Sequence, residues 1–78
     1  MSKVYVDVMA EFTRDGDLIP KSLKWTDDVW YEIDRVTDIR RAASLKAGGA
    51  GMRYTCIIGG QKRYLFNEDN NMWFMEGQ

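Results

Sequence analysis

A chain of 78 residues forms one domain, residues 1–78, and a domain of this size buries only about 60% of the surface that its unfolded chain exposes, so we expect no deep substrate pocket. Its 45% apolar content exceeds that of disordered chains, and its 11 basic and 12 acidic residues nearly cancel to a net charge of −1. The absence of histidine excludes Ser–His and Cys–His nucleophile pairs and imidazole metal sites. We therefore expect a non-enzymatic protein with no catalytic residue, no metal site and no cofactor.

The first third of the chain is predicted to form two strands joined by a tight turn. Apolar residues alternate with other residues through 4–12, the period of two expected when one face of a strand is buried. Asp15-Gly16 supplies the turn, because glycine accepts the positive φ that a tight hairpin requires. The return strand spans 18–25. Pro20 has no N–H for the ladder, so this strand starts late or lies at an edge.

Residues 29–37 are predicted to form a third strand after a turn at 27–28. The segment is rich in β-branched and aromatic side chains, which fit the half-buried surface of a sheet. Val36 breaks the alternation of its apolar residues. A β-bulge near Asp34 or Arg35 would repair the phase, because one extra residue returns the later side chains to the core face.

The next segment, residues 38–47, is predicted to form one or two helical turns. Asp38 is a suitable N-cap, good helix formers follow, and Gly48 is placed to end a helix. Three glycines in 48–51 then form a flexible joint. We therefore expect the connection from Asp38 to Gly51 to be the most mobile part of the chain.

The last third of the chain repeats the hairpin style. Residues 52–58 and 61–66 form two strands that the Gly-Gly turn at 59–60 joins. A polar turn at 67–71 leads to a short last strand at 72–75.

Five or six short antiparallel strands indicate an all-β domain that curls into a small barrel and so hides its own edges. We favour an SH3-like barrel with one short helical turn, because consecutive hairpins dominate the pattern. An OB-like barrel remains the alternative, since that fold places a helix between its third and fourth strands, where 38–47 lies. The residues expected to be buried are Val6, Val8, Ile33, Tyr54, Cys56 and Leu65.

The spacing of aromatic and turn residues resembles that of small uncharacterised bacterial SH3-like barrel domains, some of which lie at the C-terminus of Y-family DNA-polymerase-like proteins. The resemblance covers roughly residues 18–76 and implies the fold more than a function. The residues that carry it are Pro20, Trp25, the Val29-x-Tyr31-x-Ile33 alternation, Arg53-Tyr54, Tyr64-Leu65-Phe66 and Trp73.

Cysteine content and the N-terminal residues predict the cellular compartment of the protein. Cys56 is the only cysteine, which excludes an internal disulfide and favours the reducing cytoplasm. It lies in an apolar run without a CxxC partner, so we expect an inert buried thiol. The residues after Met1 enter an alternating strand directly, with no apolar run for a signal peptide or a membrane span. We expect a cytoplasmic protein with no membrane association.

Charge is strongly segregated along the chain. Residues 35–63 contain seven basic residues and one carboxylate, Asp38, a net charge of +6, whereas both flanks are acidic. Segregation of this kind sets up a surface field rather than a fold. We predict that the basic residues form one contiguous surface. The candidate binding residues are Arg40, Arg41, Lys46, Arg53, Lys62, Arg63 and Tyr64.

Two functions fit this pattern. A protein-interaction or adaptor module would use the acidic flanks and positive middle to attract a complementary protein partner. The alternative is a nucleic-acid-associated module, in which the basic residues neutralise phosphates and Tyr54 or Tyr64 stacks on a base. Three tryptophans, Trp25, Trp30 and Trp73, could contribute to either function, although we expect Trp25 and Trp73 to be mostly buried. We expect a monomer or a weak homo-oligomer.

Overall fold

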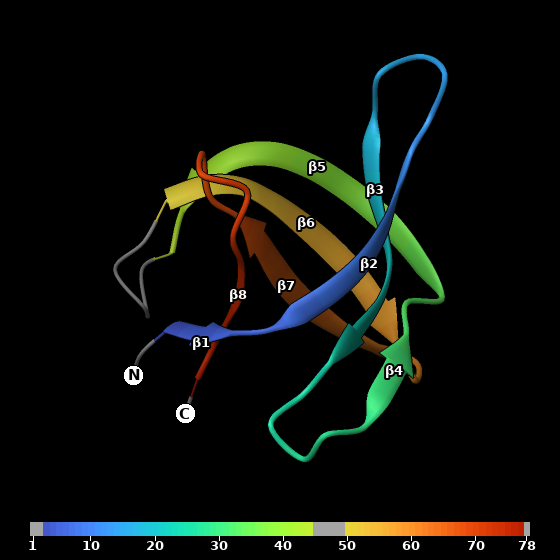
Figure 1. The fold of residues 1–78 in the computed structure, drawn as a ribbon, viewed down its shortest axis with the longest axis vertical. Coiled ribbons are helices and arrows are strands. Elements are labelled where there is room, and N and C mark those ends of the chain that lie inside the picture. Colours follow the sequence, from blue (N-terminus) through green and yellow to red (C-terminus); the bar gives the residue numbers. More distant parts are fainter. Residues whose placement is uncertain (1–2, 45–49, 78) are drawn as a thin grey trace.

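Every regular element of the computed structural model, which describes residues 3–44 and 50–77, is a β-strand (Figure 1). The all-β class is therefore confirmed, and the described residues contain no helix that is long and apolar enough to cross a membrane. The strands are β1 (Lys3–Tyr5), β2 (Asp7–Phe12), β3 (Leu18–Lys24), β4 (Trp30–Glu32), β5 (Arg35–Ala43), β6 (Ala50–Ile58), β7 (Gln61–Asn67) and β8 (Trp73–Glu76).

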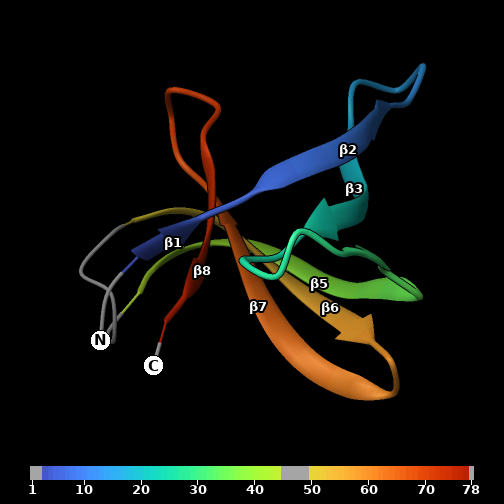
Figure 2. The same cartoon turned by 60° about the horizontal axis from the view of Figure 1, so that its bottom comes forward.

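The strands form two antiparallel sheets. One sheet has five strands in the order β1-β8-β7-β6-β5, and the other has three in the order β2-β3-β4. Most strands pair with the next strand in the chain, and the first strand, β1, also pairs with the last, β8. Figures 1 and 2 show the smaller sheet lying across the larger one, with the turn end of its β2–β3 hairpin projecting beyond the larger sheet.

Two short bends carry the chain from one sheet to the other. The backbone N–H of Val6 donates to the carbonyl of Trp73 in the larger sheet (3.1 Å), and the next residue, Asp7, already pairs with Lys24 in the smaller sheet. The sequence analysis predicted one continuous strand over 4–12 and another over 29–37. Each is divided at a bend, so the described part of the chain has eight strands instead of the expected five or six.

The core lies between the two sheets. Four of the six residues expected to be buried are buried, Ile33, Tyr54, Cys56 and Leu65, whereas Val6 and Val8 are only partly buried and pack against them. Trp25 and Trp73 also pack against this core and are half-buried. Alternation therefore identified the core face of residues 52–58 correctly, whereas Phe12, Val29 and Tyr31, which alternation placed on core faces, are exposed.

The prediction of a helix over 38–47 is wrong for its first six residues, which belong to β5. This strand pairs with β6 along its whole length, from Arg35 opposite Ile57 to Ala43 opposite Ala50. Pairing with a buried neighbour outweighs the weak helix propensity of a short segment. Residues 38–43 are consequently part of a ladder and not of a loop that connects two strands. Residues 45–47 and the predicted joint at 48–49 lie outside the described residues.

Local irregularities in the strands agree with the broken phase of the sequence. The register of β5 and β6 shifts between Val36 and Asp38, close to the bulge predicted at Asp34 or Arg35. A second shift occurs where Ala10 pairs with Pro20, so that Lys21 is the extra residue on β3. Both shifts keep apolar side chains directed to the core.

Candidate functional site

Four of the predicted binding residues lie on one face of the larger sheet, here called the basic face: Arg40, Arg53, Lys62 and Tyr64. Arg40 and Arg53 are directly opposite each other on β5 and β6. The Arg53 guanidinium lies 4.6 Å from the centre of the Tyr64 ring, and the Lys62 ammonium lies 5.5 Å from it. Both distances are within the range of a cation–π contact, so the cations hold the ring between neighbouring strands.

Arg41 and Arg63 lie on the opposite face of the same sheet. Arg41 is paired with Met52 and Arg63 with the buried Cys56, and directly paired residues share a face of an antiparallel sheet. Arg41 forms a 3.3 Å ion pair with Asp69. The predicted single basic surface is therefore divided between two faces, because alternation sends consecutive basic residues to opposite sides. Lys46 lies outside the described residues.

The basic face has one internal neutralising contact and one unsatisfied donor. Asp38 accepts a 2.7 Å hydrogen bond from Nε of Arg40, so this pair has little net charge. Nε of Arg53 is buried and has no hydrogen-bond partner among the residues that the structure describes. An unsatisfied buried donor is costly, and because this atom is buried, an anionic group reaches it only if the Arg53 side chain moves.

A groove of about 1010 Å³ runs between the β3–β4 hairpin and the β6–β7 hairpin and reaches the end of β8. We call it the aromatic groove because four aromatic side chains border it. Its lining residues are Leu23, Trp25, Trp30, Tyr31, Glu32, Ile58, Gly59, Gln61, Lys62, Arg63, Tyr64, Met75, Glu76 and Gly77.

Aromatic rings at the rim of the groove are open to solvent. Trp30 is 46% exposed and Tyr31 is 38% exposed, whereas Trp25 is half-buried and packs on the core. Large aromatic side chains that the protein holds in place on one side and that are exposed to solvent on the other are typical anchors of binding surfaces. The sequence singled out Trp25 and Trp30. It did not indicate that they share a groove with Arg63, because the β3–β4 and β6–β7 hairpins are far apart in the sequence.

Asp27 fixes this rim. Its carboxylate accepts a 2.6 Å hydrogen bond from the Tyr31 hydroxyl and a 3.0 Å bond from the backbone N–H of Val29. The bond from Tyr31 is the main cause that lowers the pKa of Asp27 below its ordinary value, and the same bond raises the pKa of Tyr31. Asp28, the next residue, has a φ of 64°, which closes the turn tightly. The rim is thus ordered before any ligand binds.

Charges along the aromatic groove are mixed. Lys62 and Arg63 line one side, and Glu32 and Glu76 lie on the other side and at the end. Arg63 donates a 2.7 Å hydrogen bond to the side-chain carbonyl of Gln61, which orients its guanidinium. The groove therefore carries both positive and negative charge, whereas the basic face is mainly positive. A ligand with apolar and polar groups fits such a groove better than a polyanion does.

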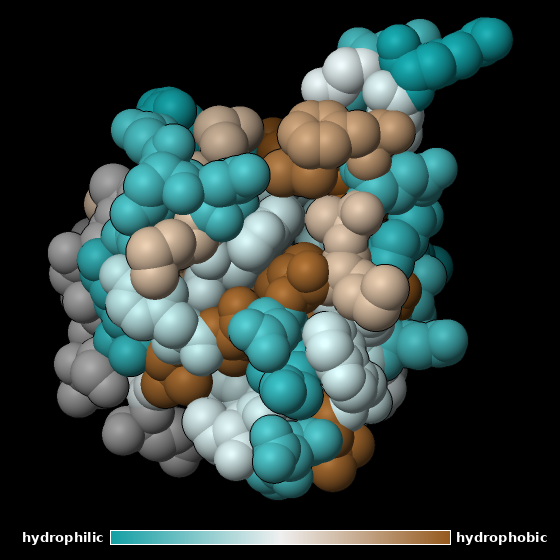
Figure 3. Space-filling model, in the orientation of Figure 1, coloured by the Kyte–Doolittle hydropathy of each residue, from teal (hydrophilic) through white to brown (hydrophobic). Residues whose placement is uncertain are grey.

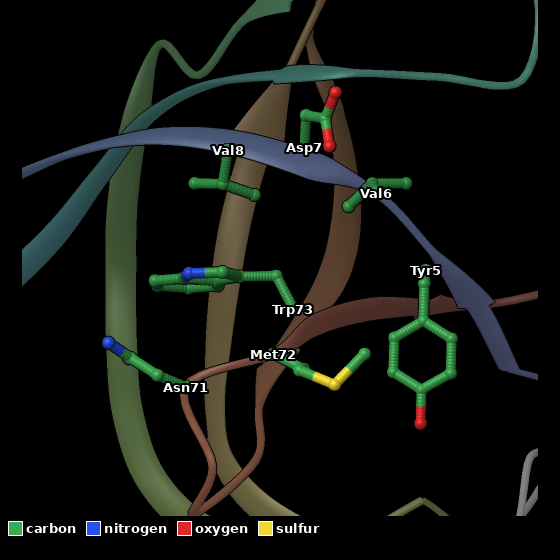
Figure 4. A pocket seen from close by; sticks show the side chains of 7 residues that line it. All are labelled: Tyr5, Val6, Asp7, Val8, Asn71, Met72 and Trp73. Carbon is green, nitrogen blue, oxygen red and sulfur yellow. The ribbon is translucent and has the colours of Figure 1, made fainter.

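A second, smaller hollow of about 510 Å³ lies where β2 leaves the larger sheet (Figure 4). One wall comes from residues 5–8 and the other from Asn71, Met72 and Trp73. Figure 4 shows the side chains of Val6 and Val8 facing the same space as the Trp73 ring and the Met72 side chain. The space-filling view shows apolar side chains gathered toward the base of the projecting hairpin (Figure 3).

Reactive groups are scarce among the residues that the structure describes. No group of three or more carboxylate or thiol side chains there could hold a metal ion. Cys56 is fully buried, and burial raises the pKa of its thiol to about 11, so the thiolate that would act as a nucleophile is disfavoured. No family model, curated protein or solved structure matches the chain.

Proposed function

We propose that this protein is a non-enzymatic interaction module that binds an extended segment of a partner protein in the aromatic groove. The exposure of Trp30 and Tyr31 on a rim that Asp27 holds in place carries the proposal. Extended peptides dock in aromatic-lined grooves through apolar and proline residues, with a few polar contacts to fix their direction. Arg63 and Lys62 supply cations for a carboxylate of the ligand, and Glu32 supplies an acceptor for its backbone or a basic side chain.

Rigid anchors support this proposal. Trp25 packs on the core, Tyr31 is hydrogen-bonded, and the short turn between them has few degrees of freedom. A preorganised rim loses less conformational entropy when a ligand binds, so more of the contact energy is retained as affinity.

Nucleic-acid binding is the second candidate function, and the basic face favours it. Arg53 and Lys62 flank the Tyr64 ring, and Arg40 lies opposite Arg53 on the same sheet face, so three cations there could neutralise phosphates. The Tyr64 ring already carries two cations, which reduces the area on which a base could stack. We therefore rank this function below peptide binding.

We further propose that the two sheets are one six-stranded meander barrel of the SH3-like kind. If the segments on either side of each bend are counted as one strand, every strand pairs with its two neighbours, and the circuit closes where β1 pairs with β8. In this arrangement the aromatic groove lies on one side of the barrel. The proposal agrees with the resemblance to small bacterial barrel domains.

A library of random displayed peptides tests the proposed function. Peptides are selected on the wild-type protein, and their affinities are then measured for Trp30→Ala and for the control Phe12→Ser, which changes an exposed aromatic residue on the distant β2–β3 hairpin. We expect selected peptides to lose at least about tenfold in affinity for Trp30→Ala and to bind the control like the wild type, because a tenfold loss is about 1.4 kcal/mol, a modest anchor contribution.

Failure of either part is informative. Peptides that bind Trp30→Ala and the wild type equally would place binding elsewhere, and a library that yields no binder would contradict the proposal. Labelled single- and double-stranded oligonucleotides at low salt test the second function. Oligonucleotide binding that Arg40→Gln and Arg53→Gln weaken, with a flatter salt dependence, would favour nucleic acid over peptide, because neither residue lines the groove.

A further inference from the structure

The outer edge of β2 has unused backbone hydrogen-bonding groups. β2 is the end strand of the smaller sheet. The N–H of Val6 points away from β3, toward Trp73, and the N–H of Thr13 donates to Asp17 across the β2–β3 hairpin (2.8 Å). Because backbone groups alternate in direction along an antiparallel strand, those of the even-numbered residues 8, 10 and 12 point away from β3.

This edge also carries exposed apolar side chains. Phe12 is 72% exposed and Met9 is 61% exposed, the two largest values among the large apolar residues of the described structure. End strands are usually protected by charge, and β5, one of the two end strands of the larger sheet, has four charged residues. The two carboxylates of β2 instead form ion pairs with lysines of β3: Asp7 with Lys24 at 3.4 Å and Glu11 with Lys21 at 3.5 Å. An unprotected apolar edge marks an interaction surface.

We propose that a second copy of this chain pairs with this edge, β2 against β2, in antiparallel orientation with a two-fold axis through Ala10. A two-fold axis perpendicular to the sheet keeps each side chain on its own face, so only residues of equal parity can stand opposite each other. With the axis at Ala10, residues 8, 10 and 12 of one copy face residues 12, 10 and 8 of the other. All of them have outward-pointing backbone groups, so the ladder continues without an unpaired group.

Neighbouring registers are less favourable because of charge. An axis at Met9 places Asp7 opposite Glu11 twice, and an axis at Glu11 places two Glu11 carboxylates face to face. The axis at Ala10 avoids both repulsions, since Glu11 then faces Met9. Charge thus selects one register.

The same register gives Phe12 an apolar environment. Phe12 of one copy stands opposite Val8 of the other, and Val8 lines the 510 Å³ hollow with Met72 and Trp73 (Figure 4). The hollow lies on the side of β2 from which the partner strand approaches, because Val6 already donates to Trp73 there. By symmetry both Phe12 rings are buried, each against the hollow of the other copy. An exposed aromatic residue and a pocket on the same molecule are what a closed, self-complementary interface needs.

A cysteine scan tests the register. Opposite residues of a hydrogen-bonded antiparallel pair have Cα atoms about 5.5 Å apart, which is within disulfide range. Under mild oxidation we expect Ala10→Cys to form a disulfide-linked dimer at least about tenfold faster than the matched controls Met9→Cys and Glu11→Cys, whose opposite positions are not cysteine in this register. The fully buried Cys56 does not interfere. Equal rates, or a faster reaction at position 9 or 11, would overturn the register.

Sedimentation tests the association itself. The wild type should convert from monomer to dimer as its concentration rises, and Phe12→Ser should raise the dissociation constant at least about tenfold, or about 1.4 kcal/mol. Val29→Ser, which changes another exposed apolar residue, 47% exposed and in the turn before β4 instead of on β2, is the matched control and should dimerise like the wild type. A wild type that stays monomeric up to about 1 mM, or equal effects of the two serine variants, would overturn the proposal.

Discussion

The hydroxyl of Tyr54 donates a 2.8 Å hydrogen bond to the backbone carbonyl of Leu18 and so joins β6 of one sheet to β3 of the other. Tyr54 is only 5% exposed, and burial is the main cause that raises the pKa of its phenol. The bond holds the turn end of the β2–β3 hairpin, where Leu18 pairs with Phe12, on the core. This bond therefore helps to fix the position of the smaller sheet, which carries the outer edge of β2 and one side of the aromatic groove, on the larger sheet.

Replacing Tyr54 by Phe tests this link. The variant keeps the ring in the core but leaves the Leu18 carbonyl without its partner, so we expect a loss of about 1 kcal/mol in the free energy of unfolding. Denaturant titration measures it. Tyr31→Phe, which removes an exposed hydroxyl, serves as the control and should cost less, and equal costs would show that the buried bond has no special weight.

Gly51 is required by a close approach of backbones. A Cβ at this position would overlap the carbonyl oxygen of Asn67 on β7, whereas a Cβ at Gly59 would meet no atom within 4 Å. We expect Gly51→Ala to cost about 3 kcal/mol, since β6 and β7 must separate. Gly59→Ala should cost about 1–2 kcal/mol, because only its φ of 58° is unfavourable. Similar unfolding free energies for the two variants would contradict this explanation.

Cys56 should resist labelling. Its side chain is fully buried and its thiol pKa is raised to about 11, so neither access nor ionisation favours reaction at neutral pH. A thiol reagent should label the folded protein slowly and the denatured protein at once. Fast labelling without denaturant would show that the core opens readily.

The stability that Asp27 gives to the rim of the aromatic groove should depend on pH. Because the folded state lowers the pKa of Asp27, the stabilising contribution of its carboxylate is present above the ordinary value of 3.8 and is lost as the pH falls through the lower, folded value. Carboxyl chemical shifts measured by NMR during an acid titration should show this low pKa. In Tyr31→Phe the pKa should rise toward the ordinary value, because the largest cause of the shift is removed. An unchanged pKa would contradict the role of the Tyr31 hydroxyl.

The sequence predicted the strands better than the site, for physical reasons. Alternation of apolar residues and glycine pairs are local signals. Alternation located the buried face of residues 52–58, and the glycines at 16 and 59–60 located two hairpin turns. Residues 38–43 read as a helix because local propensity carries no information about pairing with β6, which decides their structure. The aromatic groove brings Trp30 together with Arg63, and no local pattern indicates that two separate hairpins meet there.

Charge counting had a similar limit. The cluster of basic residues in 35–63 was visible in the sequence, but its division between two sheet faces depends on the register of three strands. The register shift near Asp38 moves Arg40 to the face of Arg53 and Arg41 to the other face. A bulge can be suspected from a broken alternation, but its position was known only within a few residues.

Chemical-shift mapping with a peptide from the displayed library tests the central claim most directly. Amide and indole N–H signals of the labelled protein are followed as the peptide is added, and the two-fold proposal for β2 does not affect this measurement at low concentration. The account predicts that the largest shifts occur at Trp25, Trp30 and Tyr31 and along residues 61–64, the two sides of the aromatic groove. Largest shifts at Arg40 and Arg53 on the basic face, or along β2, with the groove signals unmoved, would contradict it.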